Sequence, residues 1–277
     1  MMLKALLRNR FAGFLPAAFL PTVLFAMAVL VLAACTPSPD ASVDVQSGRD
    51  VLAAMHAEHA SDWYRTMTFV QTTIQHRPDG TADTTLWYEA MDLPGRLRID
   101  IGSPDSGNSW IFRNDSIYVF AGGSVVNAGP TLHPLLLLGF DVYHQDLEET
   151  ASRMDTLGFD LDVVHTAEWQ GRPAWVVGAA EGDLERNQFW IDQERRVFVR
   201  LIQKQGPLTQ EILFNKYEPL AGGWVAPEVL FHVDSTLTLE EYYAEMRADV
   251  TLPDGFFDPA TAMTAPHWFS SDGVSER

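Results

Sequence analysis

The residues that could carry chemistry are few and scattered. His56-Ala57-Glu58-His59 sets two imidazoles three residues apart on a helical pattern, but no third ligand follows at a spacing typical of a metal site. Carboxylates close in sequence at Glu148-Glu149, at Glu240-Glu241 and at Asp183 and Glu185 could pair as acid and base, and exposed charged faces explain them equally well. The chain has no G-x-S-x-G elbow and no glycine-rich phosphate loop. We therefore predict no catalytic residue, no metal and no cofactor.

Two arginines, Arg96 and Arg98, could serve in binding. Alternation along a strand places both on the same face, where they could clamp a carboxylate or phosphate at a cavity rim. The interpretation that the alternation favours puts both on a convex, solvated face beside acidic neighbours.

The only cysteine, Cys35, lies where an apolar run ends, so no internal disulfide can form. Residues 1–10 carry three basic and no acidic side chains, and residues 11–31 are almost wholly apolar apart from breaks at Pro16 and Pro21. This order is typical of a secretory signal peptide, predicted here over residues 1–34. The alternative is an uncleaved membrane helix, because about 20 apolar residues can span a bilayer.

Leu32-Ala33-Ala34-Cys35 resembles the lipobox of bacterial lipoproteins. The resemblance implies cleavage before Cys35 and acylation of its sulfur, which would anchor the protein to a membrane. Thr36 stands where lipoproteins retained in the inner membrane often carry Asp, which favours the outer membrane, facing the periplasm of a bacterial cell envelope. Residues 35–47 then read as a flexible tether. A buried, inert cysteine is the alternative.

Composition excludes several partners. The 277 residues include 19 Lys and Arg against 37 Asp and Glu, and such an acidic surface repels nucleic acid and anionic lipid headgroups. A hydrophobic fraction of 47% is ample for a core. The oligomeric state is left open.

After a helix predicted over residues 50–63 with Ser47 as N-cap, the chain reads as about ten short strands separated by turns. Residues 77–80 and 113–116 are the clearest turns. Helical patterns at residues 133–140 and 145–159 interrupt the strands. The sequence predicts one mainly β domain with α elements (α+β), a curved antiparallel sheet over residues 48–260, and a C-terminal tail over residues 261–277.

Several strands are apolar on both faces, as in Ser109-Trp110-Ile111-Phe112-Arg113. A sheet with one solvated face shows clean alternation, so something must cover the second face. Either helices fill the concave side as an ordinary core, or that side keeps an apolar pocket roofed by residues 133–140.

The leading helix, the first strand with Phe69-Val70-Gln71, the strand Pro94-Gly95-Arg96-Leu97-Arg98 and the hairpin carrying Asp115-Ser116-Ile117-Tyr118 follow an order that resembles the LolA/LolB-like family, which includes outer membrane lipoprotein-sorting proteins. The resemblance covers residues 48–258. It implies an unclosed β-barrel wrapped over helices, with an apolar cavity that can hold acyl chains.

These observations favour an envelope lipoprotein that binds or transfers a lipid-like ligand or lipoprotein acyl chains without catalysis. The alternatives are an interaction or sensor protein that binds another envelope protein with the same fold, and an unrecognised hydrolase. The residues predicted to line the concave side are Trp87, Trp110, Phe112, Tyr118, Phe120 and Trp190. The predicted cover of the cavity is Leu135, Leu136, Leu137 and Leu138.

Overall fold

The computed structural model describes residues 44–269, which belong to one compact unit. The signal peptide predicted over residues 1–34, the acylation site Cys35 and most of the tether at residues 35–47 therefore lie outside the described residues. Among residues 44–269, no helix combines the length and the apolar character needed to cross a bilayer.

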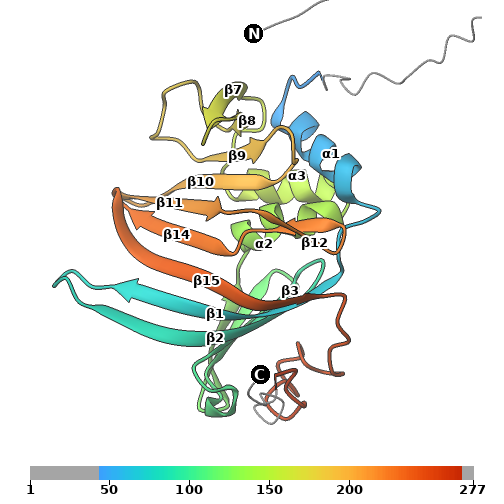
Figure 1. The fold of residues 1–277 in the computed structure, drawn as a ribbon, viewed down its shortest axis with the longest axis vertical. Coiled ribbons are helices and arrows are strands. Elements are labelled where there is room, and N and C mark those ends of the chain that lie inside the picture. The colour runs from blue at the N-terminus through green and yellow to red at the C-terminus, as the bar shows by residue number, and fades with distance from the viewer. Residues whose placement is uncertain (1–43, 270–277) are drawn as a thin grey trace, which may run out of the picture. The chain divides into compact units, whose positions relative to one another are not determined.

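A single open sheet of thirteen antiparallel strands dominates the domain (Figure 1). Its order is β6-β5-β4-β3-β2-β1-β15-β14-β11-β10-β9-β8-β7, so β6 and β7 form its two edges. The strands are β1 (Thr66–His76), β2 (Ala82–Asp92), β3 (Arg96–Ile101), β4 (Ser109–Arg113), β5 (Ser116–Ala121), β6 (Ser124–Pro130), β7 (Val164–Trp169), β8 (Arg172–Val177), β9 (Gln188–Asp192), β10 (Phe198–Gln205), β11 (Leu208–Asn215), β14 (Glu228–Val233) and β15 (Thr236–Ala248). A separate two-stranded ribbon pairs β12 (Glu218–Leu220) with β13 (Gly223–Val225).

Local turn chemistry explains most of the strand order. Of the thirteen strand pairings among the described residues, all but that of β1 with β15 join strands that are consecutive or separated only by the β12–β13 ribbon. Gly80 closes the β1–β2 hairpin at φ +83°, and Asn114 and Asp115 turn β4 into β5 at φ +52° and +53°. Both turns were predicted. Lys216 takes φ +61° directly after β11, which ends at Asn215. The pairing of β1 with β15 joins the two halves of the sheet.

The helices lie on one face of the sheet (Figure 1). They are α1 (Gly48–His59), α2 (Pro134–Gly139) and α3 (Leu147–Thr156), with 3₁₀ turns η1 (Pro104–Ser106) and η2 (Asp141–Tyr143). Their apolar side chains, among them Leu52, Met55, Leu138 and Met154, join one core with strand residues such as Phe69. We call this the inner face, and it also carries Leu97, Ile99 and Phe112.

The opposite, outer face carries Ala90, Arg98, Ile111 and Phe120, and residues 251–269 cover part of it. Phe256 and Phe257 pack against Ala90, and Ala262 packs against Ile111 and Phe120. The folded unit therefore continues past residue 260. This cover explains why neighbouring strands are apolar on both faces.

The capping box of α1 gives a first prediction. The Ser47 hydroxyl accepts a hydrogen bond from the Asp50 amide at 3.3 Å, and the Asp50 carboxylate accepts one from the Ser47 amide at 2.8 Å. Ser47→Ala is expected to lower the free energy of unfolding by about 1 kcal/mol in thermal or urea denaturation. Ser103→Ala is the matched control, because Ser103 precedes η1 without a side-chain capping bond. Equal losses in the two variants would contradict the assignment.

Candidate ligand-binding cavity

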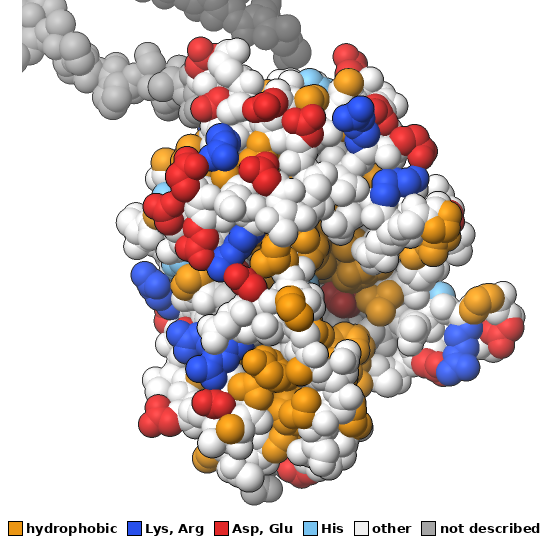
Figure 2. All heavy atoms as spheres, turned by 180° about the vertical axis from the view of Figure 1, so that it is seen from behind, with side chains coloured by type: hydrophobic (Ala, Val, Ile, Leu, Met, Phe, Trp, Pro, Cys, Tyr) orange, Lys and Arg blue, Asp and Glu red, His pale blue; other side chains and the backbone are white. Residues whose placement is uncertain are grey.

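A cavity of about 390 Å³ opens on the inner face, between the first strands of the sheet, β15 and α2. Figure 2 shows hydrophobic side chains gathered around this hollow, with an acidic group visible inside it. The volume falls within the range of small-molecule sites. Most lining side chains are aromatic or aliphatic: Trp87, Met91, Leu97, Ile99, Trp110, Phe112, Leu135, Leu136, Phe140, Phe214, Phe231, Leu239 and Tyr243.

Strand register assembles the aromatic wall. Trp110 lies opposite Ile99, and Phe112 lies opposite Leu97, so side chains of β3 and β4 point together toward the helices. The Trp87 and Trp110 rings meet edge to face with 5.6 Å between their centroids. Side chains held this way leave a preformed apolar space rather than one that a ligand must open.

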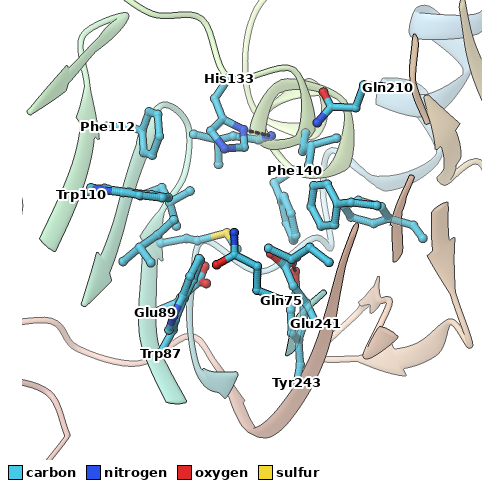
Figure 3. A pocket seen from close by; sticks show the side chains of 18 of the residues that line it. Gln75, Trp87, Glu89, Trp110, Phe112, His133, Phe140, Gln210, Glu241 and Tyr243 are labelled. Carbon is cyan, nitrogen blue, oxygen red and sulfur yellow. Dashed lines mark hydrogen bonds between the residues drawn. The ribbon is translucent and has the colours of Figure 1, made fainter. Parts of the chain in front are cut away.

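A carboxyl group, that of Glu89, points into this apolar space (Figure 3). Only 5% of Glu89 is exposed, and its carboxyl group forms no hydrogen bond or ion pair with any residue from 44 to 269. Burial raises the pKa of Glu89 well above its ordinary value, and the nearby Glu241 and Asp100 carboxylates add to the effect. The empty cavity therefore favours a protonated Glu89.

Glu241 faces the same space from β15 (Figure 3). The Tyr243 hydroxyl donates a hydrogen bond to its carboxylate at 3.2 Å, and burial raises the pKa of Glu241 despite that bond. Its neighbour Glu240 points to the other face, where Tyr242 and His76 donate to it and lower its pKa. The sequence left both acid–base pairing and an exposed charged face open for this pair, and strand alternation separates its two members.

The cavity has no strong positive charge of its own. Neither lysine nor arginine occurs among the described residues that line it. His133 caps α2 by accepting a hydrogen bond from the Leu136 amide at 3.1 Å, and burial lowers the pKa of His133 to about 4, so it is neutral near pH 7. His76 also lines the rim and pairs with Glu240. The charge that the site can develop is therefore negative.

The structure brings five of the predicted site residues to this cavity. Trp87, Trp110 and Phe112 form the wall from β2 and β4, while Leu135 and Leu136 contribute from α2. Leu137 and Leu138, also predicted as cover, are not among the lining residues and are buried in the core. The residues 133–140 thus form one side of the cavity and part of the core at once.

Three predicted cavity residues lie on the outer face instead. The tight turn after β4 sets Tyr118 opposite Ile111, and Phe120 opposite Ser109, so both point away from Trp110. Phe120 is buried beneath Ala262. Trp190 alternates with the core residues Phe189 and Ile191, and its ring packs against Trp169 and the Arg200 guanidinium. The prediction that these three line the concave side is wrong for these reasons of register.

Of the two arginines, only Arg98 differs from the favoured prediction. Arg96 is half exposed and pairs with Asp92 at 2.8 Å, as expected of a solvated face. Arg98 lies on the outer face but is only 3% exposed, because residues 251–269 cover it. Neither lines the cavity. The histidines of α1 contact backbone carbonyls, His56 that of Val142 and His59 that of Arg195, and His59 is buried.

Sequence reasoning overlooked Glu89 and the role of Glu241. The signal was present in β2, where Trp87, Glu89 and Met91 occupy alternate positions. Alternation places an acid between two residues of an apolar face. Burying an acid there is costly, so its presence indicates a functional role.

Comparison of whole structures finds several similar folds. A DUF1329 family protein from Desulfovibrio piger aligns with 77% of this chain and 97% of its own at 14% identity, with a TM-score of 0.52. A putative outer membrane lipoprotein-sorting protein domain from Vibrio parahaemolyticus aligns with 78% of this chain and 98% of its own at 13% identity, with a TM-score of 0.54. The domain has a LolA-like fold.

This result confirms the fold resemblance stated from the sequence. A LolA superfamily protein from Nitrosomonas europaea also aligns, at 13% identity over 77% of this chain and 98% of its own, with a TM-score of 0.48. No protein-family model matches the sequence, and no curated protein sequence matches it significantly. At these identities the likeness extends to the fold: a large antiparallel sheet that does not close, with few helices.

Proposed function

We propose that the protein binds a lipid-like hydrophobic ligand, or the acyl chains of a lipoprotein, in the inner-face cavity and holds it without chemical change. The observation that carries this proposal is the preformed, open cavity of about 390 Å³ with aromatic and aliphatic walls. Burial of an acyl chain there would contribute about 0.8 kcal/mol per CH₂ group, before the costs of association. The similarity to a lipoprotein-sorting domain supports the same role.

The proposed location follows from the N-terminal pattern and the fold together. The protein would reside in the bacterial cell envelope, anchored through acylated Cys35 to the outer membrane and facing the periplasm. The tether at residues 35–47 would let the domain reach its ligand, or another envelope component, while it stays anchored.

The test uses a chain that begins after Thr36 and so keeps all of residues 44–269, purified without detergent. Native mass spectrometry and analysis of an organic-solvent extract should reveal a bound lipid, or uptake of an added fluorescent lipid. Trp110→Glu should abolish either signal, because a charge in the wall of the cavity opposes burial of an apolar chain.

Val126→Glu is the matched control, since Val126 lies on β6 and is 63% exposed, and it should retain the lipid. A wild-type protein that carries no lipid and takes up none would contradict the proposal. That outcome would favour the interaction or sensor role, in which the same fold binds a protein partner.

A further inference from the structure

Two carboxyl groups inside an apolar cavity need a reason, because each is costly to bury and neither has a cationic partner among residues 44–269. Glu89 is the stronger case, because only 5% of it is exposed and its carboxyl group forms no hydrogen bond with the described residues. A leucine or methionine at this position would stabilise the empty domain better. Its orientation toward the hollow indicates that what it contacts comes from outside the chain.

The surroundings of the two carboxyl groups restrict what that contact can be. An anionic headgroup, such as a phosphate or a fatty-acid carboxylate, would meet Glu89 and Glu241 without any lysine or arginine from the described lining to offset the repulsion. A neutral ligand would not recover the cost of burying two acids. A positively charged nitrogen would recover it, by pairing with one or both carboxylates.

The aromatic wall favours the same ligand. Trp87 lies two residues from Glu89 on β2, Trp110 on β4 lies two strands away across Ile99, and Tyr243 lies beside Glu241. The faces of such rings attract ammonium groups, and combinations of aromatic rings and carboxylates are a recurrent means of binding them. Figure 3 shows the two carboxyl groups directed from β2 and β15 into the space that these rings enclose.

We propose that the cavity selects an amphiphile whose polar end is a positively charged nitrogen, held between Glu89 and Glu241 and against the Trp87 and Trp110 rings, with its apolar chain along the rest of the wall. This proposal rests on the proposed lipid-binding function and specifies the chemical class of the ligand. Binding would draw a proton from the carboxyl pair, because the cation favours the carboxylate form.

The pH dependence follows from the groups that face the pair. Tyr243 on β15, His133 at the start of α2 and His76 on β1 line the same cavity, and Asp100 on β3 acts on Glu89 from the outer face. His76 pairs with Glu240. His133 stays neutral over this range. Affinity for a cationic ligand should therefore rise from about pH 5 to about pH 8 as the pair loses its proton, and affinity for a neutral ligand should stay constant.

The experiment titrates the full chain with three probes of equal chain length, each below its critical micelle concentration: dodecyltrimethylammonium, 1-dodecanol and dodecanoate. Tryptophan fluorescence reports binding, since Trp87 and Trp110 line the cavity. The ammonium probe should bind about tenfold or more tightly than dodecanoate. The double variant Glu89→Gln, Glu241→Gln should lose that preference and keep its affinity for dodecanol.

Glu240→Gln is the matched control, because it removes the neighbouring charge on the other face, and it should retain the preference for the cation. An equal loss in Glu240→Gln would show general attraction to an acidic surface and overturn the proposal. Equal affinities for all three probes in the wild type would also overturn it while leaving lipid binding intact. If the wild type bound none of the three probes, the proposed function itself would be contradicted.

Discussion

Replacing Arg98 by alanine is expected to lower the free energy of unfolding by about 3–5 kcal/mol, because it leaves a buried carboxylate without its charged partner. Arg98 donates to Asp100 through Nε and Nη2 at 3.1 and 3.0 Å, and both side chains are almost fully buried. Its Nη1 donates to the carbonyls of Phe256 and Ala262 at 3.2 and 2.9 Å. Urea denaturation measures the loss.

The same arginine holds the C-terminal segment to the sheet, so a local effect should accompany the global one. Its guanidinium also lies 4.2 Å from the centre of the Phe256 ring, and His267 approaches Asp100 at 3.0 Å. Limited proteolysis of Arg98→Ala should therefore cut within residues 251–269 under conditions that leave the wild type whole.

Arg96→Ala is the matched control two residues away. Its half-exposed ion pair with Asp92 should be worth only about 0–1 kcal/mol. The double variant Arg98→Ala, Asp100→Ala should lose less than Arg98→Ala alone, because no charge is left unpaired. If the Arg96 and Arg98 variants unfolded alike, Arg98 would have to be solvated and the segment at residues 251–269 detached from it.

Features encoded by short stretches of sequence were predictable. The turn at Gly80, the turn at Asn114-Asp115 and the N-cap Ser47 each depend on one or two residues and their immediate neighbours. An antiparallel meander interrupted by helices follows from such local signals. The apolar stretch over residues 133–140 was correctly tied to the concave side, although it divides between the cavity and the core.

Features that depend on strand register or on distant parts of the chain were not predictable. Whether Phe120 shares a face with Trp110 depends on the register across one turn, and a shift of one residue reverses it. Arg98 looked solvated because nothing local shows that residues 251–269 fold back over it. Alternation separates Glu240 from Glu241, but which of the two faces the cavity depends on the pairing of β15 with β1, which lies far away in the sequence.

The carboxyl pair should also make the stability of the empty protein depend on pH. Burial raises the folded-state pKa values of Glu89 and Glu241 above those of the unfolded chain. At a pH between the unfolded-state and the folded-state pKa values, the folded protein binds more protons than the unfolded chain. The free energy of unfolding therefore falls as the pH rises from about 5 to about 8. Glu89→Gln, Glu241→Gln removes this penalty and should stabilise the protein at about pH 8 by roughly 1–3 kcal/mol.

At about pH 5 the double glutamine variant and the wild type should be nearly equal, since protonated glutamate and glutamine are alike in charge and size. Asp141, whose pKa burial raises to about 7, contributes equally to both proteins and cancels in the comparison. Glu240→Gln should act in the opposite direction at neutral pH, because hydrogen bonds lower the folded-state pKa of Glu240. If the double variant were instead less stable than the wild type at pH 8, the carboxylates would be stabilised as charges within the empty protein. That outcome would contradict the argument for a cationic ligand. A gain in stability on removing both acids would instead indicate that the two groups are retained for binding at a cost to folding stability.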